Sequence, residues 1–175
     1  MEILFAIADL ACVTLIVFFV IYWVAYPILF APFSISSVKD ILTMFELANL
    51  SSNDKAIDLG SGDGRVALAA SRVSKSAVGI EHNPFLTLYS RFMSLISTNG
   101  DVVFKHKDIW KENLASYDVV FIYLTGTYLN KLKHKLDREL APGSRVVTKN
   151  YALKGWKPTK QIDNKYFLYI IGKHS

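Results

Sequence analysis

The chain has 175 residues, a length that suits one domain with enough buried surface for a hydrophobic core. Hydrophobic residues make up 51% of the sequence and the mean hydropathy is +0.26, which is high for a soluble domain. The formal net charge is +5 at pH 7. The one cysteine, Cys12, excludes a disulfide framework and a thiol-rich metal site.

The apolar excess lies at the N-terminus. Asp9 is the only charged residue of segment 3–33, and the uninterrupted apolar run over residues 10–30 has the ~20 residues that a helix needs to cross a bilayer. A signal peptide would have a positive start and a shorter apolar core, and a buried core helix is the other alternative. The pattern predicts one transmembrane helix, with residues 1–33 as a membrane anchor and the lipid bilayer as a partner through residues 10–30.

The rest of the chain is basic. All 20 Lys and Arg residues follow position 38, together with 13 of the 15 acidic residues, so this part has a net charge of +7. A basic domain is electrostatically consistent with a position next to anionic lipid headgroups. We therefore expect a single-pass membrane protein whose domain, residues 34–175, lies on the cytoplasmic face, or on the matrix face of a mitochondrion.

Apolar runs typical of strands alternate with helical patterns after the first segment. The expected strands are 55–59, 77–81, 102–108, 117–124 and 145–150, followed by a hairpin of "KQI" and "YFLYIIG". The expected helices are 36–50, a helix that ends near Val73, a helix that begins at Pro84, and 127–140. In the helix from Pro84, the residues expected to face the core are Phe85, Leu88, Tyr89, Phe92, Leu95 and Ile96. This alternation favours an α/β fold with a doubly wound, mostly parallel sheet of seven strands.

The segment 58–65, "DLGSGDGR", joins the first strand to the next helix, where doubly wound folds bind ligands. Its glycines allow close approach to the backbone, but the third glycine comes one residue too early for a dinucleotide loop. Asp58 and Asp63 would repel a pyrophosphate and attract the ammonium and sulfonium groups of S-adenosylmethionine. The loop therefore predicts S-adenosylmethionine as the ligand. The loop residues expected to bind it are Asp58, Gly60, Ser61, Gly62, Asp63 and Gly64.

Acidic residues also end the second and third strands. Glu81 lies 21 residues after the first glycine of the loop, where a carboxylate can accept from both ribose hydroxyls. His82 follows, either at the edge of the ribose or as an exposed loop residue. Asp108 is expected to accept from the adenine amine, with Ile109 and Trp110 beside the base. The alternatives are a strand-end cap for Asp108 and core packing for Trp110.

The motifs "DLGSGDGR", "GIEHNP", "DIWKENL", "KLDRELAPGSRVV" and "GWKP" together resemble one group of seven-strand (class I) methyltransferases. From about Pro32 to Gly172 the chain is similar to the small protein-lysine methyltransferases of the ATP synthase c subunit and the adenine nucleotide translocase, and to their archaeal relatives. The resemblance implies a Rossmann-like fold, S-adenosylmethionine as the methyl donor and a protein lysine as the acceptor. Where the family has a P-x-V-P-T-P-like run this chain has "PFSISS", which implies a cofactor contact for Ser36.

Methyl transfer to a lysine depends on positioning, and the amine must lose its proton first, although its ordinary pKa is about 10.4. An aromatic-lined channel would disfavour the charged amine. The candidates at the ends of the fourth and fifth strands are Tyr123, Thr125, Asn150, Tyr151 and Trp156, with strand-end packing as the alternative for each. With a membrane anchor, the expected acceptor is a lysine of a membrane protein.

Other functions stay open on the sequence alone. The positive charge would suit a nucleic-acid methyltransferase, but that class carries an N-P-P-Y-like run where this chain has "YLTGTY", so no nucleic-acid partner is expected. A membrane-anchored small-molecule or lipid methyltransferase and a non-catalytic S-adenosylmethionine-binding module are the alternatives. No metal is expected, because His106, His134 and His174 lack the spacing of metal ligands.

Overall fold

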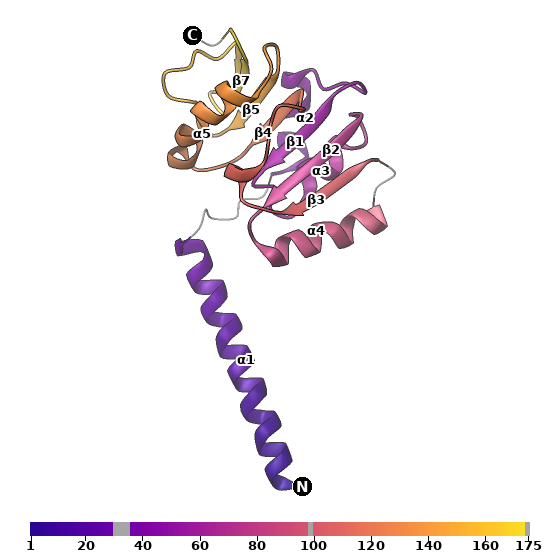
Figure 1. Cartoon of the computed structure of the whole chain (residues 1–175), viewed down its shortest axis with the longest axis vertical. Coiled ribbons are helices and arrows are strands. Elements are labelled where there is room, and N and C mark those ends of the chain that lie inside the picture. Colours follow the sequence, from indigo (N-terminus) through magenta and orange to yellow (C-terminus); the bar gives the residue numbers. More distant parts are fainter. Residues whose placement is uncertain (30–35, 98–99, 174–175) are drawn as a thin grey trace. The chain divides into compact units, whose positions relative to one another are not determined.

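The computed structural model describes residues 1–29 (with the side chains of 1, 3 and 5–21), 36–97 and 100–173. The chain divides into two compact units, Met1–Phe33 and Ser34–Ser175. The first unit contains the long helix α1, Glu2–Leu29 (Figure 1). The second contains all the strands and the remaining helices.

The prediction of a transmembrane helix over residues 10–30 is wrong. A helix that crosses a bilayer needs a run of ~20 apolar residues. Within the described part of the chain, no helix is both long enough and apolar enough to meet that requirement. Phe30, where the expected span ends, lies outside the described residues. The predicted single-pass membrane location depended on this span and is therefore wrong as well. The predicted contact with the bilayer is not supported.

The second unit is built on a seven-stranded sheet with the order β3-β2-β1-β4-β5-β7-β6 (Figure 1). The strands are β1 Lys55–Leu59, β2 Ser76–Glu81, β3 Val102–His106, β4 Val119–Ile122, β5 Arg145–Lys149, β6 Lys160–Ile162 and β7 Tyr166–Ile170. The first five strands are parallel, whereas β7 runs antiparallel to both β5 and β6. The predicted α/β fold with seven strands is therefore confirmed, and the antiparallel pair makes the sheet mixed.

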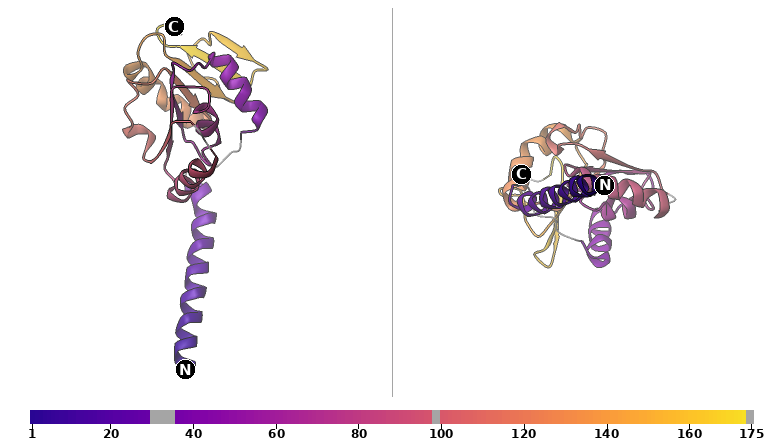
Figure 2. Two further views of the ribbon diagram at one scale, coloured as in Figure 1. Left: turned by 90° about the vertical axis from the view of Figure 1, so that its right-hand side faces the viewer. Right: turned by 90° about the horizontal axis from the view of Figure 1, so that it is seen from below.

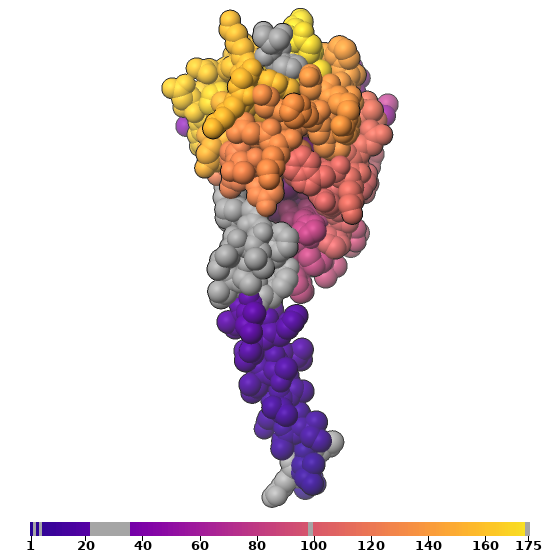
Figure 3. Space-filling view, turned by 60° about the vertical axis from the view of Figure 1, so that its left-hand side comes forward, coloured from indigo at the N-terminus to yellow at the C-terminus, as the bar shows by residue number. Residues whose placement is uncertain are grey.

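Helices cover both faces of this sheet. They are α2 Val38–Ala48, α3 Arg65–Ala70, α4 Pro84–Ser97 and α5 Gly126–Glu139, with a short 3-10 helix η1 at Ile109–Lys111. Residues of α2 and α3 share one core cluster with alternate residues of β1, β4 and β5, and α5 shares another with the residues between them. The sheet consequently lies between α2 and α5 (Figure 2). The outer side of α5 and the last strands form part of the molecular surface (Figure 3).

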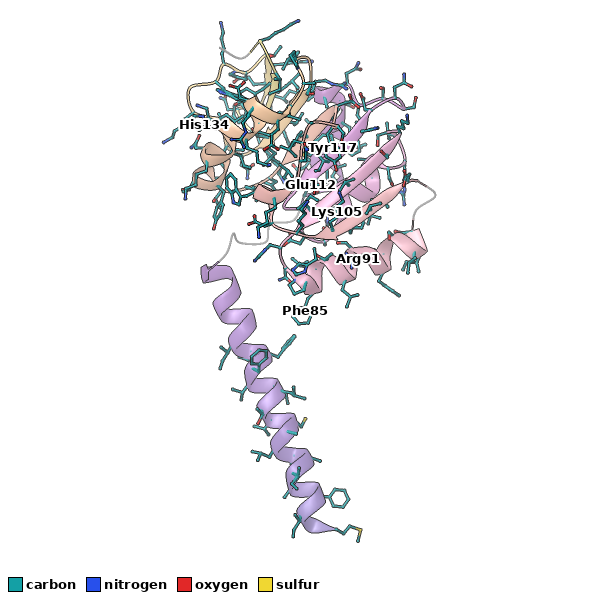
Figure 4. All side chains as sticks on the ribbon, in the orientation of Figure 1. Phe85, Arg91, Lys105, Glu112, Tyr117 and His134 are labelled. Atoms are coloured by element: carbon teal, nitrogen blue, oxygen red, sulfur yellow. The ribbon has the colours of Figure 1, made fainter. Side chains whose placement is uncertain are left out.

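Helix α4 does not present its large apolar residues to the core, so that prediction is wrong. Phe85, Leu88, Tyr89, Phe92, Leu95 and Ile96 are 50–84% exposed. The buried residues of α4 are instead Thr87 and Ser90. Ser90 Oγ donates to the carbonyl oxygen of Gly62 at 3.3 Å, which brings the helix against the glycine loop. Only small side chains fit at so close an approach, and Phe85 consequently points away from the sheet (Figure 4).

This arrangement predicts opposite effects for substitutions on the two sides of α4. Phe92→Gln combined with Leu95→Gln should change the free energy of unfolding by less than ~0.5 kcal/mol, because both side chains are exposed. Ser90→Leu should destabilise the protein by ~1–3 kcal/mol, because Ser90 is fully buried. Urea denaturation measures both changes. Comparable losses from the two variants would contradict the observed orientation of α4.

Candidate functional site

The glycine loop between β1 and α3 forms the base of the candidate site. Its three glycines, Gly60, Gly62 and Gly64, have φ angles of +79°, +55° and +81°. A Cβ atom on Gly60 would lie 2.8 Å from Leu124 Cδ2, and one on Gly64 would lie 2.7 Å from Ser90 Oγ. Both the left-handed backbone and the close neighbours therefore require glycine at these two positions.

The loop is fastened to the end of β2. The amides of Gly60 and Ser61 both donate to the carbonyl oxygen of Ile80 at 2.9 Å. Glu81 accepts from the amide of Gly62 at 2.9 Å through Oε2 and from the amide of Asn83 at 2.7 Å through Oε1. Glu81 thus orients the loop, and each of its oxygens keeps a lone pair for a further donor such as a hydroxyl.

Asp58 is a buried acid at the end of β1, with 5% of its surface exposed. Within the described residues its carboxylate receives no hydrogen bond from a side chain or a loop amide. Burial, with the nearby charges of Glu81 and Asp63, raises the pKa of Asp58 to about 8. Asp58 is therefore mostly protonated at neutral pH when no cation lies next to it.

The two polar side chains of the loop itself, Ser61 and Asp63, differ in their hydrogen bonding. Ser61 Oγ is buried without a hydrogen-bond partner, the one such side-chain atom in the described part of the chain. A buried hydroxyl left in this state costs free energy unless a ligand completes it. Asp63 is paired with Arg65, whose Nε donates to the Asp63 carboxylate at 2.8 and 3.0 Å. Asp63 is thus neutralised by an ion pair, whereas Ser61 lacks a hydrogen-bond partner and Asp58 is buried near two like charges.

The residues expected around an adenosine lie at the ends of β2 and β3. Asp108 accepts from the amide of Trp110 at 3.1 Å, so it caps η1 as the alternative interpretation had it. Trp110 is 38% exposed, and Ile109 packs on the core under α5. His82 is exposed, and its carbonyl oxygen lies 2.8 Å from His106 Nε2. These residues share one edge of the sheet with Glu81.

The five acceptor-site candidates follow β4 and β5. Asn150 Nδ2 donates to the hydroxyl of Tyr123 at 3.0 Å, so these two residues meet. Thr125 is the N-cap residue of α5, without a side-chain capping bond. Tyr151 is 46% exposed and lies over Gly126, the next residue after Thr125. Trp156 packs against Tyr169 with ring centroids 5.7 Å apart, which is the core-packing alternative.

Ser36 lies beside this group. It is 4% exposed, and its carbonyl oxygen accepts from Arg65 Nη1 at 3.0 Å. Its hydroxyl accepts from Lys149 Nζ at 3.3 Å. The segment before α2 is thereby joined to the glycine loop and to the end of β5. Sequence reasoning missed Lys149, although a charged residue at the end of an apolar strand could have indicated it.

Within the described residues, no group of three or more His, Cys, Asp or Glu side chains could hold a metal ion. His174 lies outside the described residues.

A mostly parallel seven-stranded sheet with this order, and a glycine loop between its first strand and the next helix, defines a class I methyltransferase domain. The family model of the ANTKMT methyltransferase domain matches residues 58–160. The chain belongs to this family.

Individual relatives agree with this assignment. The protein-lysine N-methyltransferase of Saccharolobus islandicus is 33% identical, over 82% of this chain and 95% of its own length. The lysine N-methyltransferase of the ATP synthase c subunit from Rattus norvegicus is 32% identical, over 74% of this chain and 58% of its own length. The chain thus spans just over half the length of that curated relative. Among solved structures, an RNA methyltransferase from Salinibacter ruber in complex with S-adenosyl-L-homocysteine has a TM-score of 0.77 and 28% identity, over 81% of this chain and 96% of its own.

Proposed function

We propose that the protein is an S-adenosylmethionine-dependent protein-lysine N-methyltransferase. The observation that carries the donor is the combination of the buried Asp58 carboxyl, which lies near the like charges of Glu81 and Asp63, and the Ser61 hydroxyl, which is buried without a hydrogen-bond partner. A ligand with an ammonium group and hydrogen-bonding atoms would stabilise both. The lysine acceptor is supported by the Saccharolobus islandicus relative, which this chain matches over 95% of its length.

The residues present fit S-adenosylmethionine. Asp58 and Ser61 would hold its amino acid portion, and the left-handed glycines leave the loop backbone open to close approach. Glu81 has lone pairs for the ribose hydroxyls. Asp108 and Trp110 would lie at the adenine end. When bound, this donor supplies a methyl carbon activated by the adjoining sulfonium, so the protein contributes mainly orientation and exclusion of water.

The acceptor side requires a lysine in its neutral form, because the ammonium has no lone pair for attack. Tyr123 and Asn150 form a hydrogen-bonded pair at the carboxyl ends of β4 and β5. With Thr125 and Tyr151 nearby, they offer aromatic faces and polar atoms to orient an amine. Partial desolvation in such surroundings lowers the pKa of a lysine and makes the neutral amine more accessible at neutral pH.

A second candidate function is RNA methylation, which the similarity to the Salinibacter ruber enzyme favours. One experiment separates the candidates. The full chain is incubated with S-adenosylmethionine labelled on the methyl group and with protein, RNA or lipid from a cell extract. We expect label on protein, at lysines identified by peptide mass spectrometry as gains of multiples of 14 Da, and much less label with Asp58→Asn when S-adenosylmethionine is not saturating. Label on RNA or lipid alone would overturn the lysine assignment, and binding without transfer would indicate a non-catalytic module.

A further inference from the structure

Lys149, the last residue of β5, is a buried lysine that the proposed reaction has not used. Its side chain is 3% exposed. Nζ donates to Asp40 Oδ2 at 3.0 Å and to Ser36 Oγ at 3.3 Å, and it lies 4.0 Å from the centre of the Tyr123 ring. An ammonium is rarely buried unless it is paired, because removing it from water costs free energy. Lys149 is paired with Asp40 and also lies over an aromatic face.

Asp40 does not depend on Lys149 as its only partner. It also accepts from Lys165 Nζ at 2.7 Å, from the amide of Ser37 at 2.8 Å and from the hydroxyl of Tyr166. Although burial by itself raises the pKa of Asp40, the hydrogen bonds from Lys165, Tyr166 and Lys149 hold it well below its usual range. The loss of the Lys149 charge would therefore leave Asp40 ionised and partnered.

The contact with Tyr123 follows from the sheet. Strands β4 and β5 are parallel neighbours with Ile122 opposite Thr148, so Tyr123 and Lys149 come next at the same edge. They lie on the face that α2 covers, since side chains alternate between faces. The Tyr123 ring is thus held on one face by the Lys149 ammonium and at its hydroxyl by Asn150. Two contacts of different kinds leave this ring little freedom.

We propose that Lys149 is a positioning residue of the acceptor site. It orients the Tyr123 ring, and its positive charge disfavours the ammonium form of a lysine that approaches the same ring. Like charges repel strongly where water is partly excluded, whereas a neutral amine has no such penalty. The inference rests on the proposed lysine acceptor. The charged and titratable groups around Lys149 are Asp40 on α2, Lys165 and Tyr166 at β7, Tyr123 after β4, and the Asp63–Arg65 pair next to Ser36.

The test compares Lys149→Met, which removes the charge but keeps a long apolar side chain, with Lys149→Arg, which keeps the charge. In the full chain without acceptor, NMR follows the ring carbons of Tyr123, assigned with Tyr123→Phe. In steady-state assays, kcat and KM are measured from pH 6 to 10 with a peptide that contains the acceptor lysine. S-adenosylmethionine binding is measured by calorimetry.

We expect Lys149→Met to shift and broaden the Tyr123 signals and to lower kcat at least tenfold, with less than a threefold change in donor affinity. The acid limb of its kcat profile should move to higher pH, because the bound amine keeps its proton longer without a neighbouring cation. Lys149→Arg should leave that limb in place. A role in stability alone would lower the amount of folded protein without moving the limb.

Unchanged Tyr123 signals in Lys149→Met, or changed signals with an unchanged pH profile, would overturn the proposal. If the wild-type chain transfers no methyl group to lysine, the proposed function fails separately, and the Tyr123 signals still decide whether Lys149 positions that ring.

Discussion

Asp58→Asn is expected to bind S-adenosylmethionine about 30- to 150-fold more weakly than the wild-type chain. The substitution removes a buried carboxylate that would pair with the ammonium of the ligand, and a charge-assisted hydrogen bond contributes ~2–3 kcal/mol. The wild-type affinity should itself increase as the pH rises toward 8. The reason is that Asp58 has a pKa of about 8 without ligand and must lose its proton to attract the cation. Calorimetry between pH 5 and 9 measures both effects.

The same substitution should make the ligand-free protein more stable. The pKa of Asp58 is raised from 3.8 in the unfolded chain to about 8 in the folded one, so between these values the folded state binds the extra proton. Wild-type stability should consequently fall as the pH rises through this window, relative to the Asn variant. The two proteins should agree near pH 4 and differ by on the order of 4 kcal/mol at pH 7, since each pH unit contributes 1.36 kcal/mol.

Denaturation of both proteins without ligand, at several pH values, tests this expectation. Asp118→Asn serves as the matched control, because Asp118 is an exposed acid and its Asn replacement keeps an oxygen that can accept from the amide of Lys55. A stability difference between wild type and Asp58→Asn that does not change between pH 4 and 8 would contradict the raised pKa. Unchanged ligand affinity in Asp58→Asn would remove this residue from the proposed site.

Glu112→Ala is expected to lower the free energy of unfolding by ~2–3 kcal/mol. The Glu112 carboxylate accepts from Lys105 Nζ and Lys107 Nζ, both at 2.7 Å, and from the Tyr117 hydroxyl at 3.0 Å (Figure 4). The two lysines are 40% and 38% exposed, so water can replace their partner. Most of the loss should come from the buried Tyr117 hydroxyl, which would have no acceptor.

The pH dependence of this effect has the opposite sign to that of Asp58. Although burial alone would raise the pKa of Glu112, the hydrogen bonds from Lys105, Lys107 and Tyr117 lower it below its usual 4.5. The stability that the carboxylate contributes is therefore present above pH ~4.5 and lost as the pH falls through the lower folded-state value. Thermal denaturation at pH 7 and pH 3 measures this change.

Two further variants serve as controls for Glu112→Ala. Glu112→Gln keeps an acceptor for Tyr117 and should lose less stability than Glu112→Ala at pH 7. Glu46→Ala removes an exposed acid of α2 and should change stability by less than ~0.5 kcal/mol. Equal losses from Glu46→Ala and Glu112→Ala would show that the ion cluster around Glu112 does not stabilise the fold.

Local patterns were sufficient for much of the fold. The segment 55–59 reads as a buried strand because it is a short apolar run before glycines, and it forms β1. The helical period after Pro84 correctly predicts α4, but not the side that faces the sheet. An amphipathic period shows that large residues share a face, and it cannot show that the opposite face approaches a glycine loop too closely for anything larger than Ser90.

In the candidate site, too, the sequence predicted where the residues lie but not which partners they have. The spacing of the loop, Glu81 and Asp108 depends on where strands end, so these residues could be gathered at one edge of the sheet from the sequence alone. Which acid has a partner could not be predicted in this way. Asp63 and Arg65 are two residues apart and form a pair, whereas Asp58 points into the interior and has a raised pKa.

By itself the sequence determined the order of strands and helices along the chain, the glycine loop and the family, because all of these depend on short-range patterns of apolar, glycine and acidic residues. Only the tertiary structure decided that α4 exposes its apolar side. It also brought Lys149 beneath Tyr123 and next to Asp40, over a separation of 109 residues from Asp40. Burial and charge pairing depend on contacts between distant segments, and no local pattern records them.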